Sequence, residues 1–359
     1  MKIMLGYCLG QGILAIIFDM QLVLGVDAGG TSSRAVLFTL EGEPVRRGSA
    51  GGANPVTLGM DAASANLAEA VRAALSGVSP SQVRAAVVGL AGNPALCASL
   101  SDRVLRAALP SAFPSGTNDT TPSALRVRTV GDVVTAFASG TAAASGAVLI
   151  SGTGAAAAKI SDHVPVATAD GYGWQLGDEG SAFWIGRAAA RTAIRALATP
   201  DQPAGLLTSL VVCHLLQEAD GGGDPVARLA AAVHARHPLA LAELAPLVSR
   251  AARAGDPAAV SIAGEAARRL ARTVSAVHEP GLPIVLFGGV LTTEGPVREA
   301  VRDLLDGAGT VTVAGDPAGA AAWLAARAFL DARESRARHA RFTAAPPHVG
   351  LAVIETESG

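Results

Sequence analysis

The stretch from Leu22 to Phe38 constrains the fold most strongly, because it reads as two strands joined by a glycine turn: LVLGVDAGGTSSRAVLF. One apolar run covers residues 22–26 and a second covers residues 34–38, with a Gly pair between them. Aliphatic and β-branched runs bounded by glycines predict a tight hairpin. The chain is therefore expected to begin its fold as an antiparallel pair of strands.

The turn of this hairpin has the chemistry of a phosphate-binding site. Gly29 and Gly30 lack a Cβ, so a ligand can approach the backbone, and the N–H groups with the Thr31 and Ser32 hydroxyls can bind a phosphate. Asp27 at the end of the first strand is suited to hold a hydrated Mg²⁺ through water, because Mg²⁺ prefers oxygen ligands. An ordinary glycine-containing hairpin is the alternative for this stretch taken alone, since such turns are common.

A second stretch, AVLISGTGAAAAKI at residues 147–160, has the same pattern. An apolar strand leads into a turn containing Gly152, Thr153 and Gly154, and a strand of small residues follows. Two such hairpins, far apart in the sequence, predict a nucleotide bound by two halves of the protein. The phosphate-binding sequence G-x-x-x-x-G-K-[ST] does not occur, which excludes a P-loop enzyme. Lysine is nearly absent (Lys2 and Lys159), so phosphate charge is expected to be met by backbone N–H groups, hydroxyls and magnesium.

These two turns, together with GDEGS at residues 177–181, resemble the BadF/BadG/BcrA/BcrD ATPase family within the sugar kinase, actin and Hsp70-type superfamily. The resemblance spans about residues 21–341. Within the family, the chain resembles the N-acetylglucosamine kinases, which are its best-known sugar-binding members. It implies an α/β, two-domain ribonuclease H-like (actin-type ATPase) fold with an interdomain cleft. It also implies ATP and Mg²⁺ as cofactors.

The resemblance gives the expected domain ranges. Residues 1–20 are expected to be an N-terminal extension, for which an upstream mis-assigned start or a poorly ordered segment is favoured over the alternative of a true targeting segment. The remaining ranges are an N-terminal ATPase and sugar domain (21–142), a C-terminal nucleotide domain (143–317), a closing helix that returns to the first domain (318–342) and a tail (343–359).

Apolar periodicity predicts alternating strands and helices, which indicates mixed sheets covered by helices. The helices are expected at residues 61–75, 96–109, 133–139, 183–197, 226–235, 240–254, 258–278, 296–305 and 318–341. Strands beyond the two hairpins are expected at residues 84–90, 125–130, 284–287 and 311–313. Loops are expected at residues 49–59 and 113–124.

The amino-acid composition argues against several classes of binding partner. The net charge is −2, without a basic stripe, which argues against nucleic acid. The three cysteines are scattered and form no C-x-x-C pair, which favours a reducing, cytoplasmic setting and argues against an iron–sulfur cluster. The first 18 residues are short for a bilayer span, and no membrane partner is expected. A homodimer is left open.

Asp132 is the expected catalytic base. It follows an apolar strand and precedes a helix, and sugar phosphorylation needs a group that accepts the hydroxyl proton. The resembling kinases carry an Asp at this strand end. A helix N-cap is the alternative role for an Asp in this place.

The sugar site implied by the resemblance draws on several segments. Asp178 is expected to accept sugar hydroxyls, with Glu179 either doing the same or capping the next helix. Trp174 and the backbone at Gly173 are expected to face the sugar, although a core Trp is the alternative. Asn54 is a sugar ligand or a routine turn residue before Pro55. Asp132 and Thr153 complete the expected set.

Gly288 and Gly289 close a buried strand and match the adenosine-binding turn of the superfamily, where a side chain would block the purine. A plain strand-to-helix turn is the alternative. Thr292 and Thr293 follow the turn and are candidates to line the nucleotide.

The expected function is ATP-dependent phosphorylation of an amino sugar, N-acetylglucosamine first, with glucosamine or another hexose as substrate alternatives. A non-kinase ATPase of the activator type is the second reading, and it would need an iron–sulfur cluster that the cysteine spacing does not favour. A sugar-sensing repressor is the third, and about twenty residues before the first strand leave no room for a helix-turn-helix.

Overall fold

The computed structural model describes residues 20–110, 125–199, 205–216 and 223–345. The expected N-terminal extension, the loop at 113–124 and most of the tail at 343–359 lie outside the described residues. The chain divides into two compact units, one formed by residues 1–129 with 315–359 and the other by residues 130–314. These limits differ from the expected boundaries at 142/143 and 317/318. The first boundary lies earlier because α4 (Asp132–Gly140) packs on β6 (Gly146–Ser151) and β9 (Ile284–Phe287), which are strands of the second unit.

The first unit is built on a five-stranded sheet with the order β3-β2-β1-β4-β5. β1 pairs antiparallel with β2, which pairs antiparallel with β3, while β4 is parallel to β1. The strands are β1 Leu22–Ala28, β2 Ser32–Thr39, β3 Pro44–Gly51, β4 Val83–Leu90 and β5 Arg126–Gly131.

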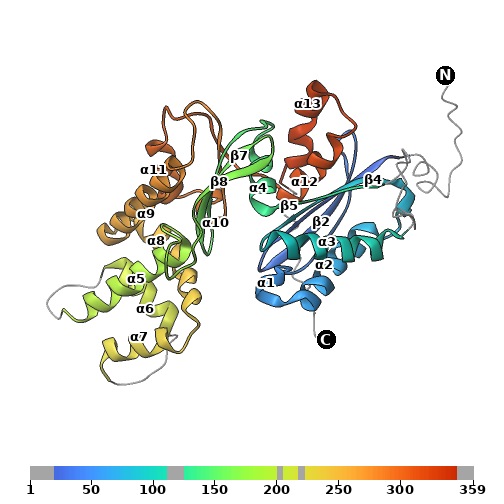
Figure 1. Cartoon of the computed structure of the whole chain (residues 1–359). Helices are drawn as coiled ribbons and strands as arrows, with labels where there is room; N and C mark the ends of the chain where they lie inside the picture. The colour runs from blue at the N-terminus through green and yellow to red at the C-terminus, as the bar shows by residue number, and fades with distance from the viewer. Residues whose placement is uncertain (1–19, 111–124, 200–204, 217–222, 346–359) are drawn as a thin grey trace, which may run out of the picture. The chain divides into compact units, whose positions relative to one another are not determined.

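Helices cover both faces of this sheet (Figure 1). α2 (Met60–Leu75) and α3 (Pro94–Ala108) pack on one face, where their apolar stripes join the even-numbered residues of β1 in a single core. α12 (Pro317–Ala326) packs on the other face, against β1. It approaches closely because β1 carries Gly25 there, and a Cβ at this position would lie 2.1 Å from the Ala318 carbonyl oxygen.

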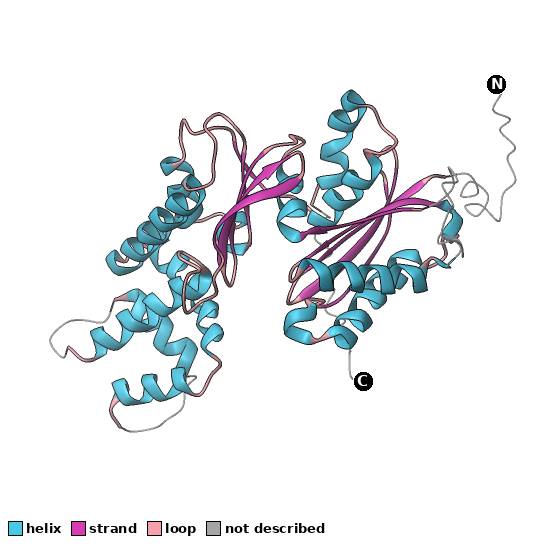
Figure 2. Cartoon of the chain, in the orientation of Figure 1, coloured by secondary structure: helices cyan, strands magenta, loops and turns pink. Residues whose placement is uncertain are grey.

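The second unit repeats the plan with the order β10-β9-β6-β7-β8. β7 pairs antiparallel with both β6 and β8, and β9 is parallel to β6. The first sheet has the same arrangement of antiparallel and parallel pairs (Figure 2). The strands are β6 Gly146–Ser151, β7 Ala155–Ser161, β8 Val164–Asp170, β9 Ile284–Phe287 and β10 Val311–Val313. The helices are α5 Ala182–Leu197, α6 Leu206–Leu216, α7 Pro225–His234, α8 Ala245–Arg253, α9 Pro257–Ser275, α10 Gly289–Thr292 and α11 Pro296–Leu304.

The predicted α/β class is confirmed by these two sheets, and most strands and helices lie where periodicity predicted them. Some expectations are wrong. The helix expected over 240–254 is a 3-10 helix at Pro238–Leu244 followed by α8, because Pro246 fits only the first turn of an α-helix. The loop expected at 49–59 contains the end of β3 and the short helix α1 (Pro55–Leu58).

The closing helix expected over 318–341 is two helices, α12 and α13 (Ala332–Thr343). The break follows from a capping box, in which Asp331 accepts the Glu334 N–H at 2.8 Å and Glu334 accepts the Asp331 N–H at 3.3 Å. Both helices belong to the first unit, as the return of the chain predicted.

Candidate functional site

The first glycine turn is closed by its own backbone. The Gly29 N–H donates to the Ser32 carbonyl at 3.0 Å, and the Ala53 N–H donates to the Gly29 carbonyl at 2.9 Å. Residue 52 must be glycine, because a Cβ there would lie 2.2 Å from the Gly30 carbonyl oxygen. The segment after β3 is therefore seated directly on the turn.

Within the described part of the chain, the N–H groups of Gly30 and Thr31 donate no hydrogen bond. Thr31 is exposed and Ser32 half-buried, so both hydroxyls lie at the surface of the turn. Asp27 lies two residues before Gly29 on β1, half-buried and in register with Arg34 of β2. This set offers N–H donors, hydroxyls and one carboxylate, which is the donor set that a magnesium–phosphate group requires.

Asn54 lies beside the first turn, and it caps α1. Its Oδ1 accepts the Val56 N–H at 2.9 Å, so the turn-residue role is present. The same oxygen also faces the turn after β4, where a Cβ at Gly92 would lie 2.9 Å from it. Within the described residues, the Asn54 Nδ2 group donates no hydrogen bond.

The second glycine turn follows β6 and is held by the GDEGS segment. The Gly152 N–H donates to the Gly154 carbonyl at 2.9 Å within the turn. The Ser151 hydroxyl donates to the Gly180 carbonyl at 3.1 Å, and the Ala182 N–H donates to the Gly152 carbonyl at 2.8 Å. As in the first turn, the N–H groups of Thr153 and Gly154 donate no recorded bond to any described residue.

Each residue of GDEGS has a local structural reason. Gly177 leaves room for the Asp170 carboxylate, since a Cβ would lie 2.1 Å from Asp170 Oδ1. Gly180 has φ of +81° and lies against α9, where a Cβ would be 2.7 Å from the Ala266 carbonyl oxygen. Ser181 caps α5 by accepting the Trp184 N–H at 3.1 Å.

Asp178 is buried, with 9% of its surface exposed, and it has φ of +57°. Its Oδ1 accepts the Ala155 N–H at 3.1 Å, and its carboxylate packs on the Cα of Gly154. Burial raises the pKa of the Asp178 carboxyl, the Ala155 hydrogen bond lowers it, and the nearby Asp170 carboxylate raises it. Asp178 therefore contacts the second glycine turn directly.

Glu179 points to α9, where it forms an ion pair with Arg269. Arg269 also binds Glu265 at 2.8 Å and lies over the Trp184 ring at 4.8 Å. Glu179 does not cap α5, because Ser181 does.

Trp174 contacts Phe183 edge to face, with ring centroids 5.3 Å apart, and is partly buried. Gly173 is exposed, with φ of +85°, and its carbonyl accepts the Gly177 N–H at 2.8 Å. These contacts fix the loop that precedes GDEGS.

The Gly288–Gly289 pair lies beside the second glycine turn. Gly288 has φ of +88°, and a Cβ there would lie 2.4 Å from the Ser151 carbonyl oxygen. Gly289 begins α10, and Thr292 bonds back to the Gly288 carbonyl through its hydroxyl at 3.1 Å.

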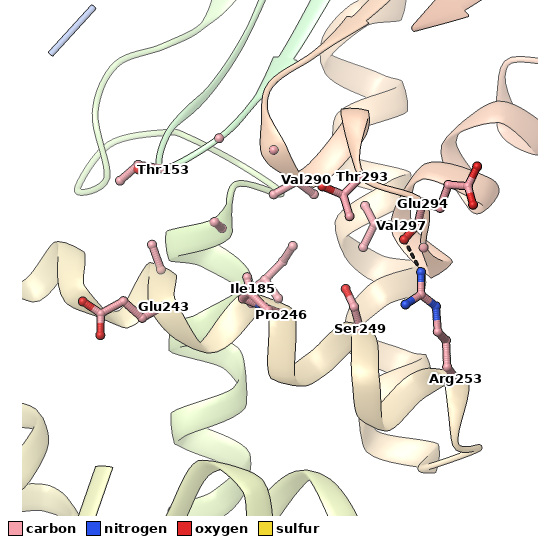
Figure 3. Close-up of a pocket in the computed structure, with 16 residues that line it drawn as sticks. Thr153, Ile185, Glu243, Pro246, Ser249, Arg253, Val290, Thr293, Glu294 and Val297 are labelled. Atoms are coloured by element: carbon pink, nitrogen blue, oxygen red, sulfur yellow. Dashed lines mark hydrogen bonds between the residues drawn. The ribbon is translucent and has the colours of Figure 1, made fainter. Parts of the chain in front are cut away.

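A cavity of about 630 Å³ connects these two turns within the second unit (Figure 3). Its apolar walls include Ile185, Pro246, Val290 and Val297. Its polar lining comes from residues on the 3-10 helix, α8 and the segment after α10, namely Glu243, Ser249, Arg253, Thr293 and Glu294. Arg253 is held by a hydrogen bond to the Glu294 carbonyl, the dashed line in Figure 3.

Sequence reasoning found Gly152, Thr153, Gly289 and Thr293 of this lining and missed the α8 side. An Ala-rich helix carries no motif, and only Pro246 marked where it begins. A cavity lined by apolar side chains, a few polar groups and two glycine turns has the composition of a small-molecule site.

Four glycines in the expected nucleotide-binding turns share one feature. At Gly29, Gly30, Gly152 and Gly289 a Cβ would meet nothing within 4 Å, and φ is not in the left-handed region. Neither internal packing nor backbone conformation requires glycine at these positions. All four lie in the turns expected to bind ATP, and in each turn the space beside the glycine is open to a ligand.

Asp132 is the first residue of α4, and Gly131 is its N-cap. The alternative role of Asp132 as the N-cap is therefore wrong, because the N-cap is the residue before it. Burial raises the pKa of the Asp132 carboxyl above its ordinary value, while the N–H groups of Val133 and of Asp132 itself lower it. A partly buried carboxylate with a raised pKa at a helix start has the properties of a proton acceptor.

Within each unit the structure brings part of the expected site together. In the first unit the turn at 29–32 lies beside Asn54. In the second unit the turn at 152–154 lies beside Asp178 and Gly288, whereas Glu179 is turned to Arg269.

Comparison with known proteins gives a family and a fold. The sequence profile of the family described as BadF/BadG/BcrA/BcrD ATPase matches residues 24–320. A candidate N-acetylglucosamine kinase from Chromobacterium violaceum is similar in structure, with a TM-score of 0.58, 25% identity, and coverage of 85% of this chain and 99% of that one. A candidate N-acetylglucosamine kinase from Porphyromonas gingivalis has a TM-score of 0.63, 22% identity, and coverage of 90% and 99%. The expected ribonuclease H-like, actin-type fold is confirmed by these matches.

No match was found among curated protein sequences. Of the helices in the described residues, none combines the length and apolarity that a bilayer crossing needs.

Proposed function

Because the chain belongs to the BadF/BadG/BcrA/BcrD ATPase family, we propose that it is an ATP-dependent kinase that phosphorylates N-acetylglucosamine to N-acetylglucosamine 6-phosphate. The similarity at 25% identity to a candidate N-acetylglucosamine kinase supports the choice of sugar. The observation that carries the nucleotide part is the open space beside Gly29, Gly30, Gly152 and Gly289. The three cysteines are scattered in the sequence and form no C-x-x-C pair, which supports action in the cytoplasm.

In this proposal the cavity of the second unit takes the nucleoside. The base lies between Pro246, Ile185 and Val290, where its apolar faces are shielded, and Gly289 leaves room for it. The N–H groups at Thr153 and Gly154 and at Gly30 and Thr31 bind phosphate oxygens, assisted by the hydroxyls of Thr31 and Ser32. The chain has two lysines, and the cationic side chain that lines the cavity is Arg253, so these neutral donors are assigned the phosphate contacts at the two turns.

The donor set at the first turn fits a magnesium ion that keeps most of its water. One carboxylate, Asp27, lies next to the phosphate turn, and Mg²⁺ in phosphoryl-transfer sites is usually held by one or two carboxylates and the phosphates. When bound, the ion neutralises phosphate charge. Asp27 would hold it through water.

Asp132 accepts the proton of the attacking sugar hydroxyl as the phosphoryl group arrives. Asn54 donates from its Nδ2 group to a sugar oxygen, and Asp178 accepts a sugar hydroxyl at the edge of the second turn. Glu179 is assigned to the ion pair with Arg269 in the free protein, so its sugar contact would need that pair to open.

Product identification tests the proposal. Purified protein, magnesium-ATP and each of N-acetylglucosamine, glucosamine, N-acetylmannosamine and glucose are incubated, and the product is examined by mass spectrometry and ³¹P NMR. A 6-phosphate formed from N-acetylglucosamine in preference to the other sugars supports the proposal. Preference for another sugar changes the substrate, and ATP hydrolysis without any sugar phosphate moves the assignment to the ATPase class.

A further inference from the structure

Asp170 is the last residue of the edge strand β8, and it has an unusual backbone. Its φ is +62°, a region that residues other than glycine rarely adopt. Its carboxylate accepts three backbone N–H groups: Gly171 at 2.8 Å and Asp178 at 2.7 Å on Oδ1, and Glu179 at 2.8 Å on Oδ2. A carboxylate that accepts three N–H groups fixes the loop between 171 and 179 at both of its ends.

The segment fixed by Asp170 is the one that holds the second glycine turn. The Asp178 carboxylate accepts the Ala155 N–H, and the Gly180 carbonyl accepts the Ser151 hydroxyl. The Ala182 N–H donates to the Gly152 carbonyl. The Phe183 N–H also reaches the Thr153 carbonyl, at 3.4 Å. Thus four contacts run from residues 178–183 to residues 151–155.

The conformation of GDEGS depends on Asp170 in return. Gly177 has no side chain where the Asp170 carboxylate lies, and Asp178 adopts a left-handed φ directly after it. Without the Asp170 carboxylate, the N–H groups of Asp178 and Glu179 lose their hydrogen-bond acceptor. The strain of the left-handed backbone at Asp178 is then no longer offset by these hydrogen bonds.

We propose that Asp170 is a positioning residue for the phosphate donor: it sets the GDEGS segment, which in turn holds the second glycine turn so that the N–H groups of Thr153 and Gly154 face the triphosphate. This inference rests on the proposed function for the identity of the ligand. It assigns the GDEGS segment to nucleotide binding as well as to the sugar.

Asp170→Asn is the most selective test. Asn tolerates the left-handed φ and keeps one carbonyl oxygen for the bonds on Oδ1, but it places an NH₂ group opposite the Glu179 N–H. The dissociation constant for magnesium-ATP, measured by calorimetry without sugar, is expected to rise about tenfold, in line with the loss of a charge-assisted hydrogen bond. The dissociation constant for sugar, measured separately, is expected to rise as well, because Asp170 also holds the N–H group of Asp178, the proposed sugar ligand.

Asp162→Asn is the matched control. Asp162 is also an aspartate with a positive φ, +49°, but it lies in the β7–β8 turn at the opposite end of β8. It is expected to leave magnesium-ATP binding unchanged. A purely structural role for Asp170 would lower the unfolding temperature and the active fraction, while the folded fraction of Asp170→Asn would keep the wild-type dissociation constant for ATP.

Ser151→Ala keeps the test decisive if Asp170→Asn does not fold. It removes the hydroxyl bond to Gly180 without touching Asp170, and it is expected to weaken magnesium-ATP binding by a smaller factor in the same direction. Wild-type ATP affinity in the folded variants overturns the inference. A wild type that binds magnesium-ATP but phosphorylates no sugar would overturn the proposed function alone, and a wild type that does not bind it overturns both.

Discussion

In the proposed function, the chemistry depends on Asp132 and the four open glycines. The glycines occupy space that the folded chain does not use, and Asp132 has a carboxyl whose pKa is raised by burial. Each feature leads to a measurable consequence that a structural role alone would not produce.

Activity is expected to depend on pH through Asp132. The base must be ionised to accept a proton, and burial raises its pKa above the usual aspartate value of about 3.9. The acidic limb of the kcat/KM profile should therefore lie above the range of an exposed aspartate, with activity lost as the pH falls through the raised pKa. A profile that stays flat down to the pH at which the protein unfolds would contradict this assignment.

Gly152→Ala and Gly289→Ala are expected to raise KM for ATP without loss of stability. The added methyl group meets no protein atom and needs no unusual φ, so the free energy of unfolding should stay equal or rise by about 0.4–1 kcal/mol. Bound ATP, however, would clash with the added methyl group, because the proposal places the nucleotide against these turns.

The control is Gly264→Ala on α9, where a Cβ makes only an ordinary contact with Arg268 at 3.6 Å. It should stabilise the helix by about 0.5–1 kcal/mol and leave KM for ATP unchanged. Unchanged KM in both turn variants would show that these glycines do not face the nucleotide.

At the scale of elements, the first sheet depends on close approach between a strand and a helix. β1 and α12 meet through Gly25, which leaves no room for a side chain. The first unit is therefore built around this contact as much as around its apolar core.

Gly25→Ala is expected to destabilise the protein. The methyl group would lie 2.1 Å from the Ala318 carbonyl oxygen and 2.2 Å from the Ala322 nitrogen, so α12 must shift. Overpacking of this kind costs about 1–3 kcal/mol, measurable as a lower midpoint in urea. A midpoint equal to that of wild type would mean that α12 does not pack on β1 in this way.

The sequence predicted elements with clear periodicity and missed those without it. β1, β2 and β6 are runs of aliphatic residues and were found, whereas β8 was missed because five of its seven residues are exposed and no alternation marks it. α6 was also missed, since its apolar residues show no face. The break between α12 and α13 had a signal, the capping box from Asp331 to Glu334, which the long Ala-rich run concealed.

The site was predictable where glycines mark it. Gly29, Gly30, Gly152 and Gly289 were found from their place after buried strands. The α8 wall of the cavity and the Asp170 carboxylate were not, because their roles come from contacts between segments distant in sequence.

At the scale of the whole molecule, the chain consists of two units with the same strand order. In each unit a glycine turn follows the central strand, which is β1 in the first unit and β6 in the second. The repeated plan explains why two glycine hairpins occur so far apart in the sequence.

Magnesium-ATP is expected to stabilise the protein against heat. A ligand that binds only the folded state adds about 2.7 kcal/mol at a concentration one hundred times its dissociation constant. The unfolding temperature should rise with the logarithm of the ATP concentration, and much less so in Gly152→Ala. An unfolding temperature that does not respond to ATP at any concentration would speak against a nucleotide site.

The most direct test of the kinase assignment is a coupled ADP-release assay with magnesium-ATP, run with and without N-acetylglucosamine on wild type and on Asp132→Asn. We expect ADP release that depends on N-acetylglucosamine, with kcat lowered about 10²–10⁴-fold in the variant and ATP binding retained. ADP release that is independent of sugar and unaffected by Asp132→Asn would contradict the account.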